Sequence, residues 1–109
     1  MKKNYNVAML VNKLSKRSQF DIVNGMPNKN LKWGKDVHPG DFIAVRYVGA
    51  RQYQHIGALS GDANKNGVLD GGDLIIHAGP SPLHYSYLRE GHFNGHVVIL
   101  KPSNRLLSK

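Results

Sequence analysis

The stretch QHIGALSGDANKNGVLDGGDLIIHAG, residues 54–79, carries the pattern on which the fold prediction depends. Two short apolar runs, HIGALS and DLIIHA, enclose a loop that is rich in Asp, Asn and Gly. Short apolar runs bounded by such residues are typical of β-strands, and Asn66-Gly67 inside the loop favours a hairpin turn. We therefore expect two strands, at 54–60 and 73–78, on which His55 and His77 are neighbours.

Outside this hairpin the sequence indicates one helix and two more strands. Residues 6–18 have a single apolar stripe at the i, i+3, i+4, i+7 spacing of a helix. The stripe consists of Val7, Leu10, Val11 and Leu14. The runs DFIAVRYV (41–48) and GHVVILK (95–101) are typical of strands. Residues 24–41 and 80–91 have the Gly, Pro and Asn content of loops, the second with space for one helical turn.

One helix followed by antiparallel strands predicts an α+β fold. We expect the N-terminal helix to pack on a small antiparallel sheet or partly open barrel. A length of 109 residues suits a single domain over residues 1–109, and no repeat or linker divides the chain. The tail at 103–109 is expected to fray.

Composition limits the classes of function. The chain has 15 Lys and Arg against 7 Asp and Glu, a net charge of +8, which favours anionic partners such as nucleic acid, cell-wall polymers or a membrane surface. It has no cysteine, which excludes disulfides, thiolate metal sites and a cysteine nucleophile. No signal peptide or transmembrane segment is predicted. The compartment therefore stays open: the cell wall or another extracytoplasmic site for a piece of a secreted protein, the cytoplasm otherwise.

The loop at residues 62–73 matches the oxygen spacing of an EF-hand calcium loop. Gly67 stands at position 6, where that loop turns sharply. The predicted ligands at positions 1, 3, 5, 7, 9 and 12 are Asp62, Asn64, Asn66, the Val68 carbonyl, Asp70 and Asp73. Aspartate in place of glutamate at position 12 reaches less far, so we expect a weak Ca²⁺ affinity, on the order of 10⁻⁵–10⁻³ M. The simpler alternative is a polar hairpin turn without a cation.

Two of the six histidines are candidate functional residues. We interpret His38, His84 and His92 as loop residues and His96 as a structural residue that opens the last strand. His55 and His77 differ because a hairpin places them on adjacent strands, where both can face one cleft.

Three motifs give the chain a family resemblance. PGDFIAV (39–45), QHIGALSGD (54–62) and DLIIHA (73–78), in this order, resemble the C-terminal half of the NlpC-type cell-wall endopeptidases, which are papain-like cysteine peptidases. The resemblance implies a papain-like fold, peptidoglycan stem peptide as substrate, His55 as catalytic base and His77 as the group that orients it. The calcium-like loop is then an insertion between two strands that the family joins by a shorter turn.

The nucleophile of that family is missing. The family has a cysteine at the start of a helix, and NVAMLV (6–11) places Val7 at that position. Valine has no nucleophilic group, so His55 and His77 are then vestigial. Three interpretations remain: an inactive relative that binds cell-wall peptide or glycan, a truncated or altered peptidoglycan endopeptidase or amidase, and a small basic domain that binds nucleic acid.

Overall fold

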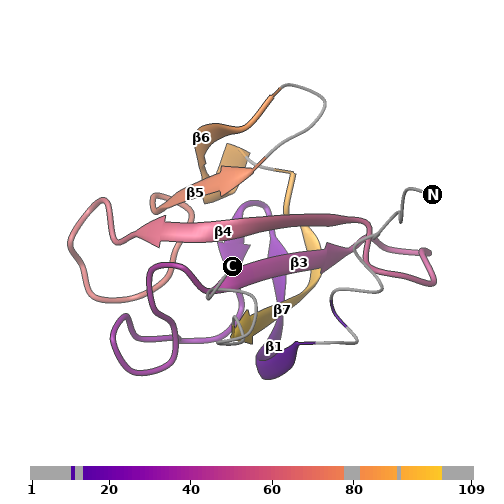
Figure 1. Ribbon diagram of the computed structural model, residues 1–109, viewed down its shortest axis with the longest axis horizontal. Coiled ribbons are helices and arrows are strands. Elements are labelled where there is room, and N and C mark those ends of the chain that lie inside the picture. The colour runs from indigo at the N-terminus through magenta and orange to yellow at the C-terminus, as the bar shows by residue number, and fades with distance from the viewer. Residues whose placement is uncertain (1–10, 12–13, 78–81, 91, 102–109) are drawn as a thin grey trace, which may run out of the picture.

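A single antiparallel sheet dominates the structure, a computed structural model that describes residues 11, 14–77, 82–90 and 92–101 (Figure 1). Its seven strands have the order β2-β1-β7-β3-β4-β5-β6. The strands are β1 (Ser15–Val23), β2 (Met26–Pro27), β3 (Phe42–Arg46), β4 (His55–Gly61), β5 (Leu74–His77), β6 (His84–Tyr87) and β7 (Gly95–Lys101), and one 3₁₀ turn, η1, spans Leu88–Glu90. Every pair of neighbouring strands in this order is antiparallel.

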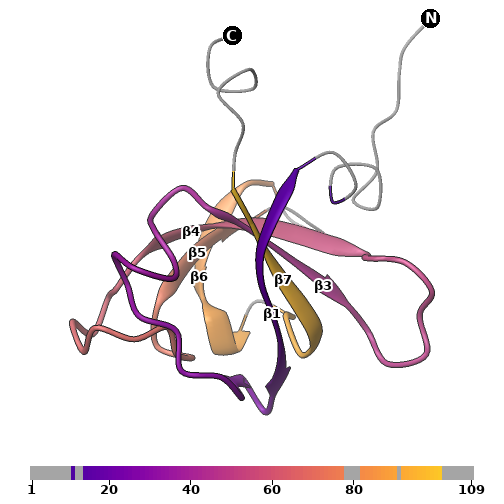
Figure 2. The same cartoon turned by 90° about the horizontal axis from the view of Figure 1, so that it is seen from below.

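The sheet curls into an open barrel. In Figure 1 β1 and β7 cross the direction of β3 and β4, and Figure 2 shows the sheet wrapped around its inner face. The two ends of the sheet approach each other at a seam formed by Gly25, Gly71 and Arg89. A Cβ atom on Gly71 would lie 2.5 Å from the Gly25 carbonyl oxygen, and one on Gly25 would lie 2.6 Å from Arg89 Cβ. Only residues without a side chain allow this approach at the two glycine positions.

Alternating side chains give the sheet two apolar faces. The inner face is filled by a large cluster that includes Ile43, Ile75 and Phe93, each at most 1 % exposed. A smaller cluster on the other face joins Val11 and Leu14 to strand residues of β3 and β7, among them Val98. Successive residues of a strand point to opposite faces, which explains why β3 and β7 are apolar at consecutive positions.

The predicted α+β fold class is wrong. Residues 15–18 of the predicted helix belong to β1, and the described residues contain no helix apart from the turn η1 and a single helical residue, Val11. In β1 the apolar residues Phe20 and Ile22 are buried and alternate with exposed residues, which is the period of a strand. Pairing with β7 from Ser15 to Ile22, interrupted by a bulge after Lys16, stabilises this strand. Most of the predicted helix, including Val7, and the tail at 103–109 lie outside the described residues.

Four strand predictions correspond to β3, β4, β5 and β7, with ends shifted by up to two residues within the described part of the chain. Two further strands lie in segments predicted as loops. Asn24 and Gly25, with φ of 53° and 80°, form a two-residue hairpin turn between β1 and β2, and β6 pairs with β5. No helix within the described ranges is long and apolar enough to cross a membrane.

Candidate functional site

The hairpin of β4 and β5 brings His55 and His77 together on the inner face of the sheet. Gly57 pairs with His77 in the register of the hairpin, and His55 precedes Gly57 by two positions, on the same face of β4. A Cβ atom on Gly57 would lie 3.0 Å from His77 Cβ and 3.2 Å from Phe93 Cζ. The missing side chain of Gly57 therefore leaves the space in which the two imidazoles and the Phe93 ring pack.

Three side chains form a continuous hydrogen-bonded chain at this position. His55 Nε2 lies 2.9 Å from His77 Nδ1, and His77 Nε2 lies 2.8 Å from Ser86 Oγ on β6. The two imidazole planes meet at 79°, so the hydrogen bond joins the edges of the rings. Both nitrogens of His77 are engaged, which fixes the orientation of that ring. We call Ser86, His77 and His55 the histidine chain.

The three members of the histidine chain differ in exposure. His77 is only 3 % exposed, whereas His55 and Ser86 are half-buried. Burial, and then the neighbouring His92, lowers the pKa of His55 below its ordinary value. Burial also lowers the pKa of His77, followed by the charges that His55, His84 and His92 would carry if protonated. Both imidazoles are therefore neutral at pH 7, and each carries one ring N–H.

Several side chains around His77 were not predicted as part of a site. His84 pairs with His77 across β5 and β6, with ring centroids 4.6 Å apart. Ser86 lies two positions further along β6 on the same face, and the exposed Tyr85 points to the opposite face. The segment HYSY contains no aliphatic residue, so its strand character was not recognised. Its only signal is the alternation that places His84 and Ser86 on one side.

The loop predicted to bind calcium forms the turn of the same hairpin, at the opposite end from the histidines (Figure 1). Lys65 and Gly67 have positive φ values of 57° and 84°, which tighten the turn. The backbone N–H of Gly67 donates to Asp62 Oδ2 over 2.8 Å. Val68 N donates to Asn66 Oδ1 over 3.1 Å.

Two of the predicted ligand carboxylates have very different environments. Burial alone would raise the pKa of Asp70, but hydrogen bonds from Asn66, Asn64 and the Gly72 amide outweigh it, so the pKa lies below its ordinary value. Asp73 is completely buried. Burial raises its pKa, and the adjacent Asp62 carboxylate adds to that rise.

Hydrogen bonds hold Asp73, whereas Asp62 has one oxygen without a partner. Asp73 Oδ2 accepts from Trp33 Nε1 over 2.9 Å, and its Oδ1 accepts from Ala63 N over 3.1 Å. Asp62 Oδ1 is buried and has no hydrogen-bond partner among the described residues. Over the same residues, no three His, Asp or Glu side chains converge closely enough to hold a metal ion by themselves. A cation in this loop would therefore need amide and backbone oxygens as well as carboxylates.

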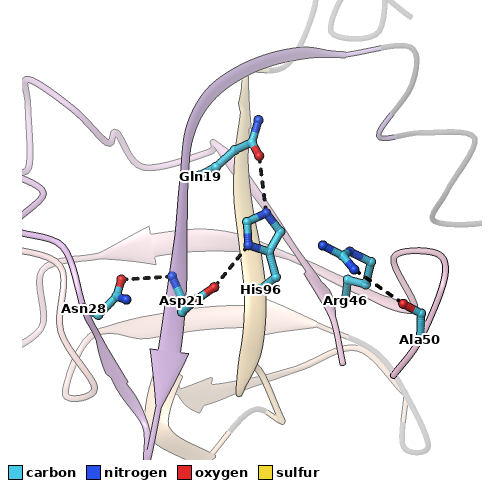
Figure 3. Close-up of polar contacts among 6 residues, drawn as sticks. All are labelled: Gln19, Asp21, Asn28, Arg46, Ala50 and His96. Carbon is cyan, nitrogen blue, oxygen red and sulfur yellow. Dashed lines mark hydrogen bonds and ion pairs between the residues drawn. The ribbon is translucent and has the colours of Figure 1, made fainter. Parts of the chain in front are cut away.

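A groove of about 610 Å³ lies at the end of β3 and β7, beside the β1–β2 turn. Figure 3 shows His96 between two oxygen atoms, with Nδ1 3.1 Å from Asp21 Oδ1 and Nε2 3.3 Å from Gln19 Oε1. Arg46 lines the groove, and its Nη1 donates to the Ala50 carbonyl over 3.5 Å. Within the described part of the chain Arg46 forms no ion pair, so its charge is available to an anionic ligand.

Val7, predicted to occupy the place of the nucleophile, lies outside the described residues, so its position relative to His55 is not defined. No protein-family model, no curated protein and no solved structure matches the chain.

Proposed function

We propose that this chain is a cell-wall peptidase-type domain that binds peptidoglycan stem peptide or glycan and does not hydrolyse it. The observation that carries the proposal is the 2.9 Å contact between His55 and His77 on adjacent strands. A buried polar group that holds a more exposed imidazole is a common way in which hydrolases orient a general base, and His77 is suited to that role. The order of the three motifs, which resembles that of the NlpC-type peptidases, supports peptidoglycan as the ligand class.

The accessible member of the pair is the one suited to exchange a proton with a ligand. His55 Nε2 is hydrogen-bonded to His77 Nδ1, whereas His55 Nδ1 has no hydrogen-bond partner among the described residues. The lowered pKa of His55 keeps it unprotonated at neutral pH, as a base requires. Without a cysteine in the chain, however, this base has no thiol to activate.

The Arg46 side chain alternates with the inner Val45, so it lies on the other face of the sheet from His55, and the groove beside it supplies a second, separate binding surface. Stem peptides carry carboxylates, and a guanidinium without an ion-pair partner among the described residues is suited to bind one. The net charge of +8 favours an anionic ligand in general.

Binding and hydrolysis are tested in one experiment. The chain, labelled with ¹⁵N, is titrated with soluble muropeptides at low and high salt, and the products are separated by chromatography. We expect chemical-shift changes at His55 and Arg46 that persist at high salt, with no cleavage. His38→Ala, at a partly exposed histidine in the loop before β3, is the control.

Two results would contradict the proposal. Cleavage that resists thiol reagents and disappears in His55→Ala would show an active enzyme with another nucleophile. Absence of muropeptide binding, together with DNA binding that falls steeply with salt, would favour the nucleic-acid alternative.

We also infer that the loop at residues 62–73 binds Ca²⁺ and stabilises the hairpin. The supporting observation is the unpartnered Asp62 Oδ1 next to the buried Asp73 carboxylate. Two adjacent carboxylates repel each other, and a divalent cation between them removes that repulsion. A cation held there would fix the turn that joins β4 to β5.

Thermal unfolding tests the calcium site. At a tenfold excess of Ca²⁺ over its Kd the folded state gains about 1.4 kcal/mol, and Mg²⁺ should give much less because it demands a smaller, more regular site. Asp62→Asn should abolish the shift, whereas Glu90→Gln, which removes a charge from an exposed position, should retain it. An unfolding temperature that is indifferent to Ca²⁺ and to chelator leaves the polar hairpin turn as the explanation of the loop.

A further inference from the structure

We propose that Ser86 is a positioning residue whose hydroxyl sets the direction of every proton in the histidine chain, so that His55 presents an unprotonated Nδ1. This inference rests on the proposed role of His55 as a base and adds the residue that controls it. It starts from the two short contacts of His77, one to His55 and one to Ser86.

A neutral histidine donates from one ring nitrogen and accepts at the other, so the chain has only two consistent directions. In the first, His55 Nε2–H donates to His77 Nδ1, and His77 Nε2–H donates to Ser86 Oγ. In the second, the Ser86 hydroxyl donates to His77 Nε2, and His77 Nδ1–H donates to His55 Nε2. The second direction places a proton on His55 Nδ1 and removes it as a base.

The first direction is the one that Ser86 supports. It places both imidazoles in the Nε2–H form, which is the commoner neutral form of histidine in water. Ser86 is half-buried, so its own proton can be donated to solvent while its oxygen accepts from His77. In this direction the buried His77 needs an acceptor for its Nε2–H, and Ser86 Oγ supplies it; without that oxygen only the second direction leaves no buried N–H unpaired.

A hydroxyl suits this position better than a carboxylate would. His55 and His84 both lie against His77, and His92 is close enough to affect the pKa of both His55 and His77. A carboxylate would favour a protonated His77, whose charge would then oppose protonation of His55. A neutral acceptor keeps His77 uncharged while His55 gains and loses its proton.

Exposure also distinguishes this role from that of a nucleophile. A serine nucleophile would use His77 as its base, and that base would have to reach the leaving group of the substrate. His77 is almost completely buried, with the His84 ring packed 4.6 Å from its own, whereas His55 is half-exposed. The accessible end of the chain is therefore His55, and Ser86 acts through His77.

The test is the protonation of each ring nitrogen, read from long-range ¹H–¹⁵N correlation spectra of the full chain labelled at histidine. We expect the Nε2–H form for both His55 and His77 in the unmodified protein. In Ser86→Ala, His77 loses its acceptor and turns to the Nδ1–H form, so His55 should reverse to Nδ1–H as well. The pKa of His55 should fall further in this variant. A proton added to His55 Nε2 would then point at the Nδ1–H of His77.

Ser86→Thr keeps the hydroxyl and should restore the unmodified spectrum, and Ser60→Ala, which removes a hydroxyl from β4, should not alter it. A His77 that is Nδ1–H in the unmodified protein would overturn the proposal without any variant. It would also be overturned by an unchanged His55 spectrum in Ser86→Ala, or by covalent labelling of Ser86 with a fluorophosphonate. These spectra need no ligand, so failure of muropeptide binding and failure of this inference are separate results.

Discussion

Gly57→Ala should damage the candidate site and the fold together. The new Cβ would lie 2.9 Å from the Ile76 carbonyl oxygen, 3.0 Å from His77 Cβ and 3.2 Å from Phe93 Cζ. The first of these atoms is backbone and belongs to the paired strand β5, so it cannot move away without displacing the ladder.

The magnitude follows from two opposing effects. Overpacking a buried position costs about 1–3 kcal/mol. Replacing glycine by alanine at an unstrained φ recovers about 0.4–1 kcal/mol, because the unfolded chain loses freedom. We therefore expect a net loss of about 1–2 kcal/mol in the free energy of unfolding, which lowers the unfolding temperature by about 5 °C or more.

The assay is urea unfolding followed by Trp33 fluorescence, with Gly61→Ala as the matched control on the same strand. A Cβ atom on Gly61 would have no atom within 4 Å, so that variant should be neutral or slightly stabilised. Loss of the His55–His77 hydrogen bond should accompany the destabilisation in Gly57→Ala alone. Equal stability of the two variants, with the histidine signals unchanged, would refute the argument that Gly57 creates the space for the imidazoles.

Three further predictions concern charge and pH. The pKa of His77 is lowered in the folded state, so the contribution of His77 to stability is complete above pH 6.5, its ordinary pKa, and is lost as the pH falls below that value. The free energy of unfolding of His77→Gln, measured in urea, should therefore depend less on pH in this range. The pKa of Asp73 is raised, so the folded state loses stability as the pH rises from about 4 through that pKa, and thermal scans should show a larger Ca²⁺ effect above this range than below it. Arg46→Gln should weaken muropeptide binding about tenfold in the titration, as expected for loss of one charged hydrogen bond, and leave the unfolding temperature unchanged; unchanged affinity would exclude the groove as the binding surface.

The sequence allowed the middle of the sheet to be predicted but not its two ends. The runs that became β3, β4, β5 and β7 are apolar and bounded by turn residues, so local patterning was sufficient. Ahead of β1, Val11 and Leu14 continue a helical spacing, which conflicts with the strand alternation of Phe20 and Ile22 that follows. At β6, tyrosine, serine and histidine gave no apolar signal, and pairing with β5 determines the strand.

The candidate site shows the same limit. Two histidines on the strands of one hairpin were enough to predict that they would be neighbours. The partner of His77 was not predictable, because Ser86 reaches it only through the register of β5 and β6. The same holds for Asp73, whose partner Trp33 lies 40 residues earlier in the chain.

The seam between Gly25, Gly71 and Arg89 has a consequence for the internal motions of the molecule. The two glycine contacts across it are steric, and among the described residues no strand ladder connects β2 to β6. Opening at this line breaks no strand ladder, only the short bridge between Lys32 and Val68 and the hydrogen bond from Trp33 to Asp73. Amide exchange should therefore be fastest in the terminal strands and slowest at β3, in the middle of the order. The histidine chain runs across β4, β5 and β6, the three strands on one side of that opening. We therefore expect its lifetime to depend on how often β6, the terminal strand, separates from β5 by breaking their ladder.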